Sequence, residues 1–191
     1  MNSNHCIVLM PEVARTEVQS ALALLGLTHH HTWEQDAAGE GYEEVWTNSA
    51  RDIAVNYVES RLFNVAYLTI RGERSDALCA DIEIMLRVFS PSELLDAVRA
   101  GKTHNERVQA LSKLAAMFPS YDEQTYRVFV AAATQHENTL LQEAAINAMG
   151  YRGWPQYIPV LEAIAAGDPS ESVRNRAVLT LIHVIGEKFV K

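Results

Sequence analysis

The feature that most constrains the fold of this chain is an internal repeat in its C-terminal half. Residues 141–150 and 173–182 align at a spacing of 32 residues, with apolar residues at the first, fifth, sixth and ninth positions of both copies. A weaker copy, residues 106–115, lies 35 residues upstream of residue 141. A period of this length, with helical spacing inside each copy, is typical of stacked helix pairs. The repeat therefore predicts an all-α helical-repeat stack.

Helix breakers and capping residues divide residues 91–191 into three predicted helix pairs. Glycine, proline and serine lie between the apolar-periodic segments, which is where helices end. The expected pairs are 93–100 with 105–117, 122–135 with 138–150, and 155–166 with 170–188.

Residues 1–90 follow a different pattern and are expected to form a separate small α+β domain. Apolar and β-branched runs predict strands, and amphipathic spacing predicts two helices, in the order β-α-β-β-β-α. The strands are expected at 5–10, 43–47, 53–59 and 62–71, and the helices at 12–27 and 76–89. The polar, aperiodic segment 28–41 is interpreted as a surface loop, and Ser60-Arg61 as a tight turn. The most economical arrangement is a small antiparallel sheet with two helices on one face.

The charge of the chain is uneven, which bears on its partners. The formal net charge is −8; residues 1–90 carry 6 basic and 13 acidic side chains, whereas residues 91–191 carry 10 and 11. Nucleic-acid binding depends largely on neutralising phosphates, so this balance disfavours it. An acidic half favours a basic protein partner, although solubility alone would also account for it.

The sequence also predicts a cytoplasmic protein that neither spans nor enters a membrane. No apolar run approaches the roughly 20 residues that a membrane-spanning helix needs. The N-terminus lacks the basic and apolar regions of a secretory signal. The two cysteines, Cys6 and Cys79, fall in predicted core elements and fit a reducing compartment.

The segment Gly167-Asp-Pro-Ser-Glu-Ser-Val-Arg-Asn-Arg-Ala-Val178 resembles the signature of HEAT and HEAT-like repeats. In that family an Asp-Pro turn precedes a Val-Arg pair and a small residue on the second helix, and prolines such as Pro155 and Pro159 lie in the first helix. The resemblance covers about residues 91–188 and is weakest in the first pair. Four residues are expected to be structural, with an ion pair bracing the turn and small residues where helices approach: Asp168 with Arg174, and Ala145 with Ala177.

The resemblance implies that the second helix of each pair lines a concave face. The polar and apolar residues that would point to this face are Glu143, Asn147, Asn175, Leu179 and His183. An exposed Leu179 among polar neighbours would suit the centre of an interface. The alternative is an ordinary solvated helix face.

Other candidate sites lie outside the repeats. The run His29-His30-His31 is interpreted as part of a solvated loop rather than a metal site, because three consecutive residues there do not converge comfortably on one ion. Cys6 and Cys79 are expected to behave as small apolar residues. Trp33, in the loop, is the best candidate for an exposed binding anchor. No cofactor and no catalytic residues are expected.

These observations favour a non-catalytic protein–protein interaction module, with two narrower or competing alternatives. One is an inhibitor of the immunity or antitoxin type, directed at a basic partner. The other is an enzyme that resembles HEAT-like DNA glycosylases or HEAT-repeat bilin lyases. A glycosylase would need a basic groove, for which only Trp154, Asp168, Arg174 and Arg176 are available, and no residue supports a bilin lyase specifically.

Overall fold

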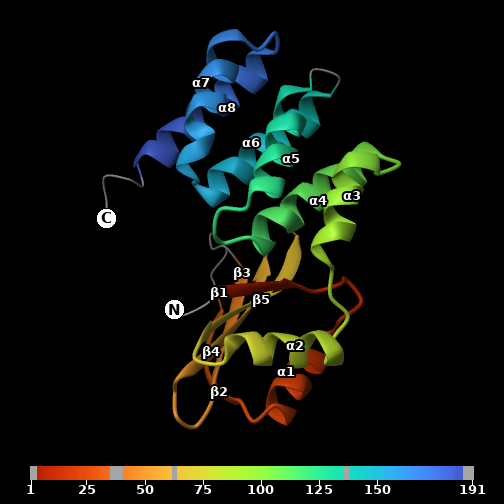
Figure 1. The fold of residues 1–191 in the computed structure, drawn as a ribbon, viewed down its shortest axis with the longest axis vertical. Helices are drawn as coiled ribbons and strands as arrows, with labels where there is room; N and C mark the ends of the chain where they lie inside the picture. The colour runs from red at the N-terminus through yellow and green to blue at the C-terminus, as the bar shows by residue number, and fades with distance from the viewer. Residues whose placement is uncertain (1–3, 35–40, 62–63, 136–137, 187–191) are drawn as a thin grey trace. The chain divides into compact units, whose positions relative to one another are not determined.

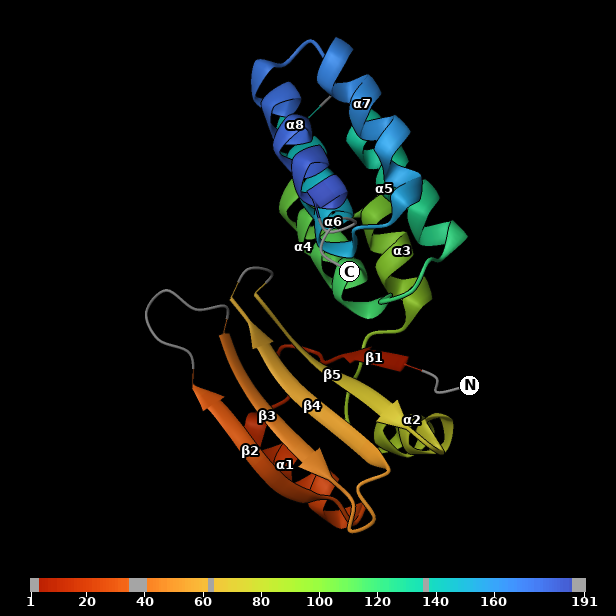
Figure 2. The same cartoon turned by 90° about the vertical axis from the view of Figure 1, so that its left-hand side faces the viewer.

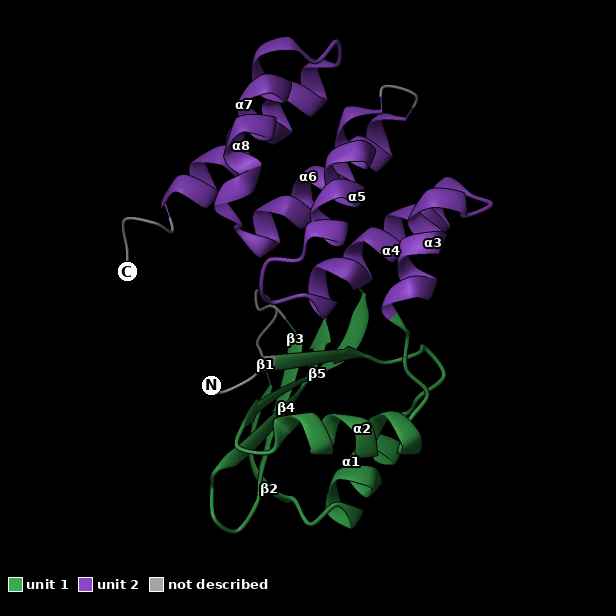
Figure 3. Cartoon of the chain, viewed as in Figure 1, with its two compact units in different colours: residues 1–90 green, residues 91–191 purple. Residues whose placement is uncertain are grey.

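The computed structural model describes residues 4–34, 41–61, 64–135 and 138–186. The chain divides into two compact units, residues 1–90 and residues 91–191, and each is described here by itself (Figure 3). Among the described residues, the helices are all too short or too polar to cross a lipid bilayer.

Unit 1 is a five-stranded antiparallel sheet with two helices on one face (Figures 1 and 2). The strands pair in the order β1-β5-β4-β3-β2. Strands β2 to β5 therefore form a meander, and β5 also pairs with β1 at the other edge of the sheet. The elements are β1 (Asn4–Val8), α1 (Arg15–Leu24), β2 (Thr28–Glu34), β3 (Gly41–Thr47), β4 (Ile53–Ser60), β5 (Val65–Gly72) and α2 (Ser75–Met85).

The register of the sheet follows from the alternation of buried side chains. Ile7 is paired with Leu68, and His5 with Ile70, so the apolar residues of β1 and β5 share one face. Val55 and Tyr57 of β4 bring the same alternation to the middle of the sheet. Together with Val18, Leu22, Leu78 and Ile82 of the two helices, these side chains form the core of unit 1. The predicted α+β architecture is confirmed.

The prediction that residues 28–41 form a loop is wrong for residues 28–34, which form the edge strand β2. This strand pairs with β3, and its register shifts at a bulge between His29 and His31. Nearly all of its side chains are exposed, since an edge strand contacts a neighbour on one side only. The usual alternation of apolar and polar residues is therefore absent, which explains why the sequence pattern failed here. Residues 35–40 lie outside the described part.

Two further boundaries differ from expectation. Helix α2 begins at Ser75 instead of residue 76, with Arg74 at the N-cap, and ends at Met85 instead of residue 89. The residues after it are extended: Val88 bridges to Leu9, and the amide of Phe89 donates to the carbonyl of Val8. Ser60, expected in a tight turn, belongs to β4, and residues 62–63 lie outside the described part.

A polar cluster within the core joins α1 to the sheet. Glu44 of β3 is only 2% exposed, and its carboxylate accepts hydrogen bonds from Tyr42, Trp46 and Gln19. Burial alone would raise the pKa of Glu44, but these three donors outweigh burial and hold the pKa below its ordinary value. Beside it, Arg15 donates two hydrogen bonds of 2.9 Å to the carboxylate of Glu59.

Unit 2 consists of three helix pairs, as the repeat predicts (Figure 1). The pairs are α3 (Pro91–Ala100) with α4 (His104–Met117), α5 (Glu123–Thr134) with α6 (Thr139–Arg152), and α7 (Ile158–Gly167) with α8 (Glu171–Gly186). A short 3-10 turn, Pro155–Tyr157, leads into α7. Helix α3 begins at Pro91, two residues before the expected start, at a position where proline loses no helical hydrogen bond.

The second helices of the pairs pack closely against one another. Helix α6 lies between α4 and α8 and contacts both extensively, whereas the first helices α3, α5 and α7 make few contacts with each other. Close packing on one side and splaying on the other bends the array around its second helices. The predicted concave face is therefore the one formed by α4, α6 and α8.

The weak first copy of the repeat has a local explanation. Glu106 stands where the later copies have Leu141 and Val173, and it is the N3 residue of a capping box. The Thr103 hydroxyl accepts from the amide of Glu106, and the Glu106 carboxylate accepts from the amides of Lys102 and Thr103. The position of Glu106 therefore serves to cap α4, whereas in the later copies the equivalent position holds a buried apolar residue.

The Glu44 cluster predicts an acid dependence of the stability of unit 1. Because the folded pKa is lowered, ionised Glu44 stabilises the fold above the unfolded pKa, near 4.5, and this contribution is lost as the pH falls through the folded pKa. In the variant Glu44→Gln, the free energy of unfolding should fall less steeply with decreasing pH below pH 4.5. The free energy of unfolding would be measured by urea unfolding between pH 7 and pH 3. Hydrogen exchange of the amides in β3 and β4 would show that the change belongs to unit 1.

The matched control is Glu34→Gln, which changes an exposed carboxylate on β2. It should keep the acid dependence of the native chain. Equal slopes for native and Glu44→Gln proteins would contradict the assignment.

Candidate functional site

The candidate site is the solvent-facing line of residues along α6 and α8. The 32-residue register makes Glu143 and Asn147 of α6 equivalent to Asn175 and Leu179 of α8. Since these helices pack side by side within the same curved layer, equivalent positions lie on the same face. The five residues predicted for the concave face therefore occupy equivalent positions on these two adjacent helices, with His183 one turn beyond Leu179.

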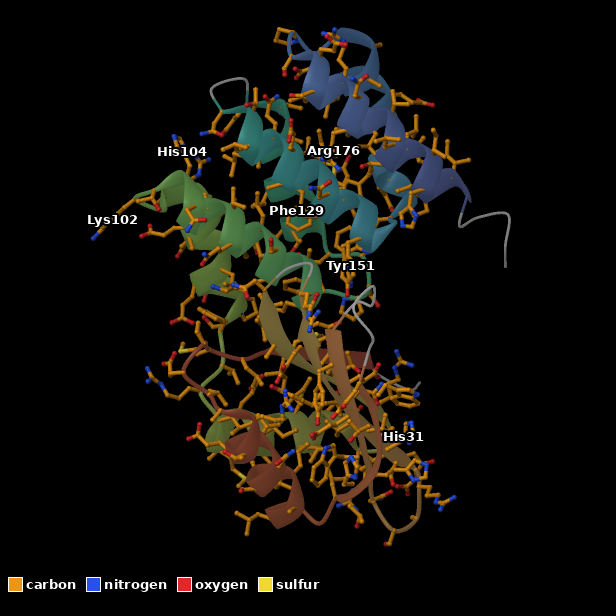
Figure 4. The ribbon with its side chains drawn as sticks, turned by 180° about the vertical axis from the view of Figure 1, so that it is seen from behind. His31, Lys102, His104, Phe129, Tyr151 and Arg176 are labelled. Carbon is orange, nitrogen blue, oxygen red and sulfur yellow. The ribbon has the colours of Figure 1, made fainter. Side chains whose placement is uncertain are left out.

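Two residues of this face were missed by the sequence analysis. Leu140 is 67% exposed and Tyr151 is 37% exposed, and both lie on the same line of α6 as Asn147. Tyr151 is the register equivalent of His183, so the repeat spacing that identified His183 could also have identified Tyr151. Figure 4 looks onto this side of the array and labels Tyr151 of α6 and Arg176 of α8.

Apolar side chains are unusually exposed on this face. Leu179 is 62% exposed, while Asn147, Asn175 and His183 around it are exposed polar residues and Glu143 is half-buried. An exposed apolar centre with a polar rim is the usual anatomy of a protein interface.

Tyr151 is held in place by its neighbour. The guanidinium carbon of Arg152 lies 4.2 Å from the centroid of the Tyr151 ring. Arg152 in turn donates from Nη1 to the carbonyl of Phe118, in the preceding repeat, at 3.0 Å. An aromatic ring fixed before binding loses little side-chain entropy on association, which suits an interface anchor.

The charge of this face differs from that of the chain as a whole. Helix α6 contains one acidic residue, Glu143, and α8 contains one, Glu171. Arg152, Arg174 and Arg176 lie on the same two helices. Helices α6 and α8 together are therefore not acidic, and the predicted preference for a basic partner, which stays a prediction, rests on the acidic charge of residues 1–90.

The predicted structural residues occupy contacts between repeats. Ala145 and Ala177 are fully buried, as close helix packing requires. The carboxylate of Asp168, itself 5% exposed, accepts from Gln142 Nε2 at 2.9 Å and from the amide of Ser170 at 2.9 Å. Arg174 donates from Nη1 to the main-chain carbonyls of Asp168 and Pro169, at 2.6 and 3.1 Å.

The brace between Asp168 and Arg174 thus differs in kind from the expected ion pair. Arg174 binds the main-chain carbonyls of the turn, whereas the Asp168 carboxylate accepts a hydrogen bond from Gln142 in the preceding repeat. Gln142 is 1% exposed and also donates to the carbonyl of Ala133, so it connects α5, α6 and the turn before α8.

The candidates in unit 1 do not converge on one site. The three histidines lie on β2, where the ring of His29 packs against Trp46 and that of His31 against Trp33. The described residues contain no group of three or more His, Cys, Asp or Glu that could hold a metal ion. Trp33 is 48% exposed, as expected, but lies on a strand rather than in a loop. Burial raises the pKa of the Cys79 thiol to about 11, and nearby Glu83 and Asp76 act in the same direction.

The residues considered for a glycosylase have different roles in the structure. Trp154 is 5% exposed and stacks on Tyr157, with ring centroids 5.4 Å apart. Asp168 belongs to the brace between repeats. Both side chains are engaged in packing, while Arg176 is exposed on α8.

Comparison with known proteins agrees with this architecture. Residues 91–182 match a family model described as HEAT repeats. No curated protein and no solved structure matches the chain.

The packing of Ala177 yields a test of the repeat register. Ala177→Leu should overpack the contact between α8 and its neighbours and destabilise unit 2 by about 1–3 kcal/mol. The control is Ala163→Leu, at an exposed position of α7. Thermal and urea unfolding would measure both variants, and an unchanged free energy of unfolding for Ala177→Leu would show that the register is wrong.

Proposed function

Because residues 91–182 are HEAT repeats, we propose that this chain is a non-catalytic protein-binding module that engages its partner on the face formed by α6 and α8. A helical-repeat scaffold commonly serves protein interaction, and its curved surface is well suited to that role. The observation that carries the proposal is the exposure of Leu140, Tyr151 and Leu179 on this single face.

The exposed apolar side chains favour binding over a merely solvated surface. Large side chains exposed singly are normal, but here three lie on two adjacent, tightly packed helices. Leu179 would fill an apolar pocket of the partner, with Tyr151 as a second, pre-ordered anchor. Asn147, Asn175 and His183 supply hydrogen-bonding groups around Leu179, which fix orientation more than affinity.

A second candidate function, inhibition of a basic partner, is favoured by a groove in unit 1. The groove lies between α1 and α2, has a volume of about 340 Å³, and is lined by Ala21, Leu24, Met85 and Leu86 among others. Leu24 is 79% exposed and Met85 40% exposed. Glu17 lines the groove, and Asp81 and Glu83 are exposed on α2. This chemistry suits a basic amphipathic helix, whose binding would weaken as salt screens the acidic side chains.

Three matched variants distinguish the two surfaces. Leu179→Asp changes the face of α6 and α8, Leu24→Asp changes the groove, and Ala131→Asp changes an exposed position on α5 as a control. Each full-length tagged protein would be used to capture partners from a lysate of the source organism treated with nuclease. We expect a stoichiometric protein with the native chain, with Leu24→Asp and with Ala131→Asp, and its loss with Leu179→Asp.

Loss of the partner with Leu24→Asp and its retention with Leu179→Asp would contradict the leading proposal and favour the groove. Capture of a nucleic acid or small molecule, with no stoichiometric protein, would contradict both. Circular dichroism of every variant would confirm that the fold is intact.

A further inference from the structure

One side of each second helix carries two apolar or small residues that the following repeat covers. On α6 these are Ile146 and Gly150, both buried. A side chain at Gly150 would place its Cβ only 2.9 Å from the Cγ2 methyl of Thr180 on α8, so the two helices touch here. Ile146 lies one turn earlier on the same side of α6.

The same two positions recur in α4. At the 35-residue spacing, Ile146 and Gly150 correspond to Leu111 and Ala115, which are also fully buried. Helix α4 packs against α6 as α6 packs against α8. The side of a second helix that bears these positions is therefore the surface on which the next helix stacks.

On α8 the equivalent residues are exposed. At the 32-residue spacing, Ile146 and Gly150 correspond to Val178 and Ile182, which are 42% and 64% exposed. We call the surface formed by Val178 and Ile182 the free edge of α8. It is the repeat equivalent of the surfaces through which α4 contacts α6 and α6 contacts α8. From Val178 to Gly186, α8 contains no Asp, Glu, Lys or Arg.

The opposite edge of the array has a different character. On α6, the side that faces α4 bears the apolar residues Leu141, Ala144 and Ala148. Their equivalents on α4 are Glu106, Gln109 and Lys113. A polar outer face is what a terminal repeat needs for solubility. This polar edge does not match the apolar free edge of α8, so head-to-tail stacking of successive copies is disfavoured.

We propose that two copies of this chain associate through the free edges of α8, related by a two-fold axis. A two-fold interface brings the same patch of each copy together, so an uncharged apolar edge meets an identical one without repulsion. With the two helices antiparallel and the axis near Thr180, Val178 of one copy faces Ile182 of the other. Growth beyond two copies is disfavoured, because it would stack the exposed polar residues Glu106 and Gln109 of α4 on an apolar edge.

This inference is independent of the proposed partner face. Asn147 and Tyr151 point to the concave side rather than to the free edge, so pairing would leave them accessible in both copies. The assembly would then present two partner-binding faces, and binding to an immobilised partner would gain from bivalency.

The test is the oligomeric state of the full 191-residue chain in solution. Sedimentation equilibrium and light scattering after gel filtration should give twice the monomer mass of 21.3 kDa. Ile182→Arg places a charge at the centre of the interface and should weaken dimerisation at least about tenfold. Leu140→Arg is the matched control, because Leu140 is equally exposed at 67% but lies on α6 away from the free edge, and it should remain dimeric.

A second measurement tests the geometry. In the Val178→Cys/Ile182→Cys double variant, mild oxidation should give a disulfide-linked dimer, whereas Leu140→Cys should not cross-link. A monomer at all concentrations, a series of growing oligomers, or a dimer unaffected by Ile182→Arg would each overturn the proposal. Circular dichroism of Ile182→Arg would show that its helices are retained.

Discussion

The repeat half of this protein depends on the close approach of its second helices. Ala115 of α4 and Gly150 of α6 are small enough for the next helix to lie directly against them, and Thr180 of α8 occupies the space that a side chain at Gly150 would need. A helix pair of this size cannot bury its apolar surface alone, so each pair is stable only against its neighbours. Curvature follows from the same contact, because the second helices approach closely and the first helices do not.

Hydrogen bonds determine the register of this stack, which apolar packing alone leaves free to slide. Gln142 reaches from α6 to the carboxylate of Asp168 and to the carbonyl of Ala133, and all of these groups are shielded from water. A buried amide or carboxylate without a partner is costly, so the two repeats fit together in one way only. Unit 1 uses a comparable device, in which Glu44 and its three donors fix α1 against the sheet.

The exposed apolar residues of α6 and α8 separate into two groups with different origins. Leu140, Tyr151 and Leu179 lie on the concave side, where no helix of the array could ever cover them. Val178 and Ile182 lie where the repeat pattern itself would place another helix. The first group is a surface that the architecture leaves open, and the second is an interior surface that happens to be exposed on α8. This difference is why we assign the first to a partner and the second to another copy of the chain.

The sequence by itself determined the helical repeat, the three pairs and the buried alanines, because a fixed period records a contact that recurs along the chain. The five residues predicted for the concave face follow from the same period, and their role in binding stays a prediction. The order of the sheet, the strand at residues 28–34 and the brace from Gln142 to Asp168 were decided only in three dimensions. The β1–β5 pairing and the contact from Gln142 to Asp168 join segments that are distant in the chain and share no periodic pattern. The strand β2 pairs with its neighbour β3, but its exposed edge lacks the alternation by which a strand is recognised in a sequence.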